Sequence, residues 1–223
     1  MLAVNFGLIL GVYRKLGILG LYIWIPMAVI IANIQVVKTV ELFGLTATLG
    51  NIAYASSFLV TDILSENHGK AAARKAVWIG FFSIIAMTIF MNAALLYAPA
   101  ESDFAQESLV TIFSLMPRIA LASLAAYLIS QTHDVWAYEF WRKRFPSDRA
   151  IWIRNNASTM VSQALDTLVF VAVAFWGQFE ARVLLEIFLT TYLMKWIVAA
   201  LDTPFIYAAK RMHNKGLIKA AVE

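Results

Sequence analysis

Long apolar runs, separated by short charged breaks, follow one another along the whole sequence. The runs are Met1–Tyr13, Gly17–Val37, Thr46–Leu64, Ala76–Ala98, Leu109–Ser130, Ser158–Phe179 and Leu184–Ala209. All but the first have about the 20 residues that a helix needs to cross roughly 30 Å of hydrocarbon. The first run is shorter, which is typical of a tilted or interfacial helix. Because backbone groups in lipid must be bonded internally, and strand-like alternation is absent, the runs predict transmembrane helices.

The composition changes this picture only by excluding a soluble protein. Of the 223 residues, 61% are hydrophobic and 14% are charged, whereas soluble domains usually carry about 25% charged residues. No linker or polar block of domain size interrupts the apolar runs, so we expect a single transmembrane domain over residues 1–223. The chain has no cysteine, which excludes disulfides and thiolate metal sites.

Basic residues are concentrated in alternate loops. They are Arg14 and Lys15, then Lys70, Arg74 and Lys75, then Arg142, Lys143, Arg144, Arg149 and Arg154, and finally Lys210, Arg211, Lys215 and Lys219. The intervening loops are mainly acidic, with Arg182 as the clear exception. Since cytoplasmic loops are enriched in Lys and Arg, this alternation predicts a cytoplasmic C-terminus. The net charge of +4 is explained by these loops, and we expect no nucleic-acid partner.

The third apolar run carries polar and aromatic residues on one helical face. Tyr54, Phe58, Asp62 and Glu66 follow one another at intervals of four residues, so they form one stripe on a helix. A charged side chain inside a bilayer costs about 2.5–3.5 kcal/mol on the insertion scale, and it therefore faces a partner or a cavity. Two aromatic rings followed by two carboxylates favour a flat heteroaromatic solute, because rings stack and a carboxylate accepts two adjacent N–H donors.

The sixth run repeats this arrangement. Asn156, Thr159, Gln163, Asp166 and Phe170 are spaced three, four, three and four residues apart, again on one helical face. Asp166 lies deepest in its apolar run and is the hardest of the acidic residues to explain by a contact between helices. We predict a substrate site made of Asn33, Tyr54, Phe58, Asp62, Glu66, Gln163, Asp166, Phe170, Lys195 and Asp202.

Structural roles are the alternative for several of these residues. Glu66 could have a purely structural role, as an ion pair with Lys70 one helical turn away. Lys195 and Asp202 could form an ion pair that joins helices. Amides such as Asn33 could hydrogen-bond between helices, which is worth about 0.6–2 kcal/mol in membranes.

Enzyme motifs are absent from the sequence. His68, His133 and His213 show no H-E-x-x-H or other metal-ligand spacing. There is no G-x-S-x-G elbow, no phosphate-binding loop, and no pair of aspartates in the motifs of an intramembrane protease. We therefore expect a binding or transport protein that is not an enzyme and has no metal or cofactor.

Several sequence blocks resemble the queuosine precursor transporter family, which belongs to the vitamin uptake transporters. They are FLVTDILSENHG at Phe58–Gly69, ASLAAYLISQTHDV at Ala122–Val135 and RNNASTMVSQALDTLVFVAVAF at Arg154–Phe175, with NIQVVK at Asn33–Lys38 and DTP at Asp202–Pro204. These blocks are distributed over most of the chain. The patterns T-D-x-x-x-E and S-x-x-x-D-T fall on successive expected helices, which makes the resemblance specific.

The resemblance implies uptake of 7-deazaguanines, chiefly preQ0 and preQ1, through the bacterial inner membrane for queuosine salvage in tRNA. It implies an all-α integral membrane protein with a six-helix core, similar to the S-components of energy-coupling-factor transporters; this chain adds a short N-terminal helix. Energy-coupling subunits or a second copy of the chain are the partners it suggests, with the small residues Ala28 and Ala32 as a contact surface. Another vitamin-like heterocycle remains an alternative substrate, and a non-transporting helical scaffold remains an alternative function.

In such a site, each group of a deazaguanine has a candidate partner. A carboxylate such as Asp62 or Asp166 could accept the ring N–H and the exocyclic amine together. Donors for the carbonyl are available on Gln163, Asn33 or Lys195. The flat ring could lie on Tyr54 or Phe58.

Overall fold

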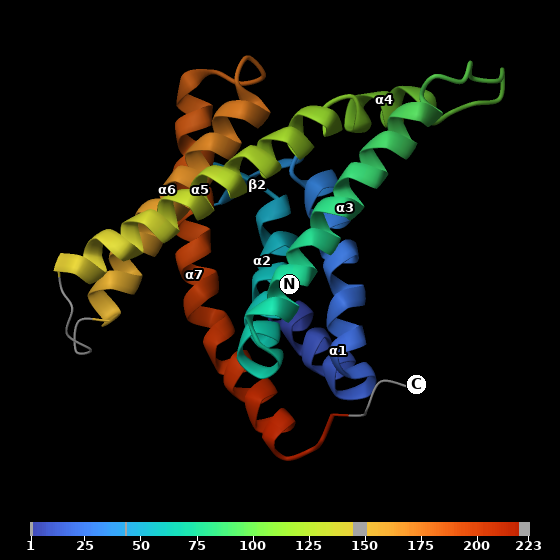
Figure 1. The fold of residues 1–223 in the computed structure, drawn as a ribbon. Helices are drawn as coiled ribbons and strands as arrows, with labels where there is room; N and C mark the ends of the chain where they lie inside the picture. Colours follow the sequence, from blue (N-terminus) through green and yellow to red (C-terminus); the bar gives the residue numbers. More distant parts are fainter. Residues whose placement is uncertain (1, 43, 145–150, 219–223) are drawn as a thin grey trace.

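The computed structural model describes residues 2–42, 44–144 and 151–218, and nearly all of them are helical (Figure 1). The elements are α1 (Leu2–Gln35), β1 (Thr39–Leu42), β2 (Leu45–Thr48), α2 (Gly50–His68), α3 (Lys70–Ala94), α4 (Gln106–Phe113), α5 (Met116–Arg144), α6 (Ile151–Phe175) and α7 (Ala181–Asn214). Four stretches of this part of the chain are long and apolar enough to cross a membrane: α1, α3, Gln106–His133 and α7. The prediction of an all-α membrane protein is confirmed.

The remaining two core helices are α2 and α6. The apolar part of α6, Thr159–Phe175, is shorter than a full span, and α2 has a lower content of apolar residues than its neighbours. These are the two helices that carry the predicted polar stripes. Their polarity therefore marks the place where the bundle faces something other than lipid.

Helix α1 consists of two helical segments that meet at Gly17. Its backbone there has φ 59° and ψ −144°, a left-handed conformation that glycine adopts at little cost. After this break the chain folds back on itself. A Cβ atom at Gly20 would lie only 2.6 Å from a side-chain carbon of Val12, eight residues earlier. The sequence prediction of a short helix before a longer one is confirmed, and Gly17 is the residue that separates them.

The short segment packs against the bundle through one apolar face. Phe6, Ile9 and Tyr13 are at most 1% exposed, and the Phe6 ring lies edge-on to Phe205 of α7 at 5.1 Å. The Tyr13 hydroxyl is hydrogen-bonded to Nε2 of His68 at 2.9 Å. Through these contacts the segment covers the ends of α2 and α7. At 1.5 Å per residue it is only about 22 Å long, which is shorter than the hydrocarbon core of a bilayer.

A β-hairpin replaces the predicted start of the second long helix. Strands β1 and β2 pair antiparallel, with Thr39 opposite Thr48 and Leu42 opposite Leu45. The backbone of Thr46 is bonded to α7: its N–H donates to Glu186 at 3.1 Å and its carbonyl accepts from Thr190 at 3.0 Å. The prediction that the helix begins at Thr46 is therefore wrong by about one turn, because these tertiary bonds hold the chain extended until α2 begins at Gly50.

A proline divides the fifth predicted run into α4 and α5. Pro117 has no N–H to donate to the carbonyl four residues earlier, which is that of Phe113. The side chain of Asn92 on α3 donates to this carbonyl instead, at 3.2 Å. An interhelical bond thus satisfies the backbone group that the proline leaves free.

The helices form two groups that also touch each other through α3 and α5. Helices α1, α2 and α3 pack together, α5 and α6 pack along each other, and α7 contacts both groups (Figure 1). The small residues Ala28 and Ala32 are buried within the chain, each 4% exposed. A Cβ atom at Gly50 would lie 2.5 Å from the Ala32 carbonyl oxygen, so small residues at this crossing let α1 and α2 approach closely.

Candidate functional site

Two connected cavities lie between α2 and α6, beside α7. We call the first the ion-pair cavity; its lining includes Asn33, Asn51, Tyr54, Phe58, Ser123, Asp166, Thr167, Phe170, Thr191, Met194 and Lys195. We call the second the carboxylate cavity; it is lined by Phe58, Asp62, Thr159, Met160, Gln163, Lys195, Trp196, Val198 and Asp202. Their volumes are about 70 Å³ and 320 Å³. Phe58, Lys195 and Val198 line both, so the two cavities meet at these side chains.

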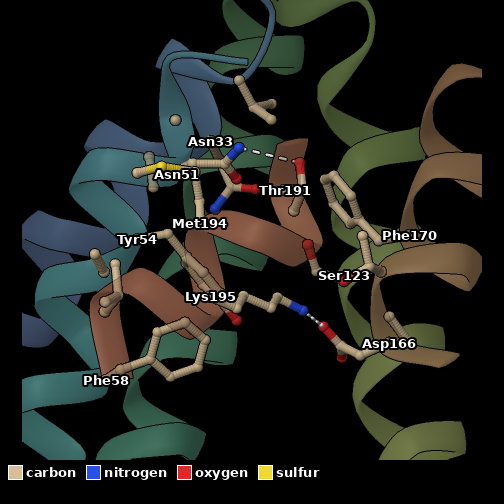
Figure 2. Close-up of a pocket in the computed structure, with 17 residues that line it drawn as sticks. Asn33, Asn51, Tyr54, Phe58, Ser123, Asp166, Phe170, Thr191, Met194 and Lys195 are labelled. Carbon is tan, nitrogen blue, oxygen red and sulfur yellow. Dashed lines mark hydrogen bonds and ion pairs between the residues drawn. The ribbon is translucent and has the colours of Figure 1, made fainter. Parts of the chain in front are cut away.

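The ion-pair cavity is crossed by a bond between α7 and α6. Lys195 Nζ lies 2.6 Å from Asp166 Oδ2, and these side chains are 12% and 24% exposed (Figure 2). The other Asp166 oxygen accepts from the Ser130 hydroxyl of α5 at 3.2 Å. Each oxygen of this carboxylate therefore has a partner, and three helices converge on it.

The alternative pairing of Lys195 with Asp202 is not formed. Residues seven apart on one helix are separated by about 10.5 Å along its axis, which is too far for a direct ion pair. Lys195 instead extends toward α6, where Asp166 lies.

Aromatic rings from α2 and α6 flank the ion pair. The Tyr54 and Phe58 rings contact each other edge to face at 5.0 Å. Figure 2 shows them on one side of the cavity, with Phe170 and Asp166 on the other side and Lys195 extending between them. Edge and face contacts of this kind leave ring faces available for a flat ligand.

Two amides line the far end of the ion-pair cavity. Asn33 is 7% exposed, and its NH₂ group donates to the Val29 carbonyl of its own helix at 2.7 Å. Asn51 donates to the Thr191 hydroxyl at 3.0 Å (Figure 2). The first bond lies within α1, whereas the second joins α2 to α7.

The polar groups of the carboxylate cavity are arranged differently. Asp202 is 3% exposed, yet within the described residues its carboxylate has only its own backbone N–H as a hydrogen-bond donor. In the same part of the chain, the side chains of Asp62 and Gln163 have no hydrogen-bond partner, although the Gln163 backbone carbonyl accepts from the Thr167 hydroxyl. The charges of Asp62 and Asp202 act on each other, so two neighbouring carboxylates face this cavity without a cation of their own.

The structure brings the two predicted stripes together on opposite walls. All of the predicted site residues except Glu66 line one cavity or both. Glu66 lies outside them and forms an ion pair with Lys210 of α7 rather than with Lys70. Asn156 lies among residues whose side chains the structure does not describe. That the lining residues bind substrate stays a prediction.

Several lining residues were not predicted from the sequence. Asn51 precedes Tyr54 by three residues, so extending the Tyr54 stripe by one helical step would have found it. Thr191 precedes Lys195 by four residues, and the two therefore share a face of α7. Ser123 and Met194 gave no such signal. Small and apolar residues of this kind are common throughout an apolar helix, and only packing decides which of them reach a cavity.

Comparison with known proteins agrees with this architecture. The sequence model of the family described as "Putative vitamin uptake transporter" matches residues 48–209. This chain belongs to that family. The matched range contains both stripes and all of α7 that lines the cavities. No solved structure matches the chain, so its likeness to S-components stays a prediction.

Similar bacterial proteins carry a more specific name. A "Probable queuosine precursor transporter" of Bacillus subtilis (strain 168) is 52% identical over 209 residues, which covers 94% of this chain and 91% of the relative. A "Queuosine precursor transporter" of Escherichia coli (strain K12) is 27% identical over 198 residues, covering 85% and 86%. A third relative, from Haemophilus influenzae, is 28% identical over 135 residues, covering 60% and 54%.

Proposed function

We propose that this chain is an uptake transporter for queuosine precursors, 7-deazaguanines such as preQ0 and preQ1, in the bacterial inner membrane. The observation that carries the proposal is a pair of joined cavities, lined by both polar stripes, in a chain 52% identical to a relative with that name. Cavities between helices, mostly apolar with a few convergent polar groups, are the usual sites of small ligands.

The junction of the two cavities supplies the groups that a deazaguanine requires. The flat bicycle can pack against Phe58. Lys195 can donate to the ring carbonyl, while Asp166 retains lone pairs that can accept the ring N–H and exocyclic amine. The Lys195–Asp166 ion pair already joins α6 and α7. The affinity for a ligand that bonds to both side chains would therefore depend on the relative position of these two helices.

The distribution of basic loops supports one sidedness for the protein. The hydrogen bonds of Tyr13 to His68 and His213 bring together the end of the first segment of α1 and the C-terminal ends of α2 and α7. Arg14, Lys70 and Lys210 are neighbours of these residues in sequence. This clustering of basic loops at one end supports a cytoplasmic C-terminus.

Transport by the chain alone is the simplest mechanism that the packing supports. Ala28 and Ala32, the surface expected to contact an energy-coupling subunit or a second copy, are covered by the chain itself. A heterocycle of this kind can enter down its gradient and be retained by incorporation into tRNA. Transport as the activity of this family agrees with the expectation that the chain is not an enzyme.

Queuosine in tRNA provides the test. A bacterial strain that cannot synthesise queuosine precursors and lacks its own transporter would express this chain and be supplied with preQ0 or preQ1. We expect queuosine in tRNA with the wild type and with Glu101→Gln, which serves as a loop control. With Asp166→Asn we expect the uptake rate to fall by at least about tenfold, because one charge-assisted hydrogen bond to the ligand is lost. Queuosine no higher than with an empty vector, at normal membrane levels of the chain, would contradict the proposal.

A further inference from the structure

The carboxylate cavity is lined by more acidic than basic side chains. Its ionisable lining residues are Asp62 from α2 and Lys195 and Asp202 from α7, while α6 contributes the neutral Thr159 and Gln163. Lys195 is engaged 2.6 Å from Asp166 at the junction with the ion-pair cavity. Counting Asp166 as well, three carboxyl groups and one ammonium group meet at this site, so acidic side chains outnumber basic ones by two.

Asp202 is the most deeply buried of these three acidic residues. Its residue is 97% buried (3% exposed), it lines the carboxylate cavity, and no other described residue bonds its carboxylate. An unpaired carboxylate that is removed from water is costly unless a cation or donors accompany it. A bound group that brings positive charge and several N–H donors would provide both.

The size and the walls of the cavity indicate an organic cation rather than a bare metal ion. Metal ions are held by oxygen atoms that close around them at 2.0–2.6 Å in the cases of Mg²⁺ and Ca²⁺, whereas this cavity has a volume of about 320 Å³. Phe58, Trp196 and Met160 form part of its surface. Carboxylates combined with aromatic faces are the chemistry that recognises ammonium groups attached to carbon.

We propose that the carboxylate cavity is an ammonium subsite, in which Asp62 and Asp202 accept N–H bonds from a protonated primary amine of the substrate. The inference rests on the proposed function and makes it more specific. Of the two precursors, preQ1 carries an aminomethyl group that is protonated at neutral pH, whereas preQ0 carries an uncharged nitrile at the same position. With the bicycle at the Phe58–Lys195 junction, the arm on its five-membered ring enters the carboxylate cavity. The transporter therefore selects the amine-bearing precursor.

Binding of both precursors to the purified protein tests this selection. Dissociation constants would be measured by titration for the wild type, Asp62→Asn, Asp202→Asn and the control Glu101→Gln. We expect the wild type and the control to bind preQ1 at least about tenfold more tightly than preQ0, as one charge-assisted hydrogen bond provides. Each asparagine variant should lose about tenfold or more for preQ1 and stay within about twofold for preQ0, which also shows that the variant is folded.

Other outcomes would overturn the ammonium subsite and are distinguishable from failure of the proposed function. Equal wild-type affinities for preQ1 and preQ0 would overturn the subsite alone, and this measurement needs no variant. An equal loss for both precursors in Asp202→Asn, or preQ0 binding that requires sodium ions, would show that the carboxylates hold a coupling ion instead. Binding of neither precursor would overturn the subsite and the proposed function together.

Discussion

The two cavities share a wall but differ in how their polar groups are satisfied. In the ion-pair cavity, Asp166 has Lys195 and Ser130 as partners, and Asn51 bonds Thr191 across two helices. In the carboxylate cavity, the side chains of Asp62 and Gln163 have no hydrogen-bond partner within the described residues, and the Asp202 carboxylate has only its own backbone N–H. Similar side chains on the same three helices thus have two different arrangements.

This difference separates polar groups that hold the bundle together from polar groups that await a ligand. Partnered groups contribute to the stability of the empty protein, because their desolvation is offset within the fold. Unpartnered groups reduce that stability and increase affinity for a ligand that pairs with them. The two roles predict opposite responses to mutation.

The largest effect is expected for Lys195→Met, which leaves Asp166 without its cation. Breaking a buried ion pair by removing one partner costs about 3–5 kcal/mol, and we expect a loss of this order in the free energy of unfolding, measured in detergent. The double variant Lys195→Met/Asp166→Leu should recover most of it, because no unpaired charge remains. A double variant as unstable as the single one would attribute the loss to packing instead.

Asp202→Asn should have the opposite sign. Removing an unpaired carboxylate from the carboxylate cavity should leave the free energy of unfolding unchanged or raise it by about 1–2 kcal/mol at neutral pH, since no partner is lost. Thermal unfolding of the ligand-free protein, with Glu101→Gln as the control, measures this. A loss of more than about 2 kcal/mol would mean that Asp202 has a structural partner and that the two cavities do not differ as described.

A smaller effect is expected for the bond between Asn51 and Thr191. A double-mutant cycle with Asn51→Ala and Thr191→Val should give a coupling free energy of about 0.6 kcal/mol, the average for hydrogen bonds between membrane helices. The matched cycle in the carboxylate cavity, with Asp62→Asn and Gln163→Ala, should give no coupling, because these side chains are not bonded to each other. Equal coupling in both cycles would remove the distinction between the cavities.

The smallest effect is expected outside both cavities, for Lys210→Met. The Lys210 and Glu66 side chains are 47% and 45% exposed, and exposed ion pairs contribute about 0–1 kcal/mol that is reduced further by salt. Unfolding at low and high salt would therefore separate this pair from Lys195–Asp166, which should change little with salt. A large, salt-independent loss for Lys210→Met would show that exposure does not distinguish the two pairs.

The sequence by itself determined the helices and the contents of each helical face. Apolar length and the cost of unpaired backbone groups in lipid leave helices as the solution. Residues three and four apart must share a face because 3.6 residues complete a turn, which is why the Tyr54 and Gln163 stripes could be found from spacing. The break at Gly17 and the two stripes are local consequences of the chain.

Only the tertiary structure decided which faces meet. Lys195 pairs with Asp166 rather than Asp202, and Glu66 with Lys210 rather than Lys70, because such pairs depend on the rotation and tilt of one helix against another. The same holds for the hairpin anchored to α7 and for the burial of Ala28 and Ala32 within the bundle. Distances within a helix are fixed by its rise per residue, whereas distances between helices are set by the packing of the whole bundle. For that reason the sequence supplied the carboxylates, and the fold decided which of them were left without a partner.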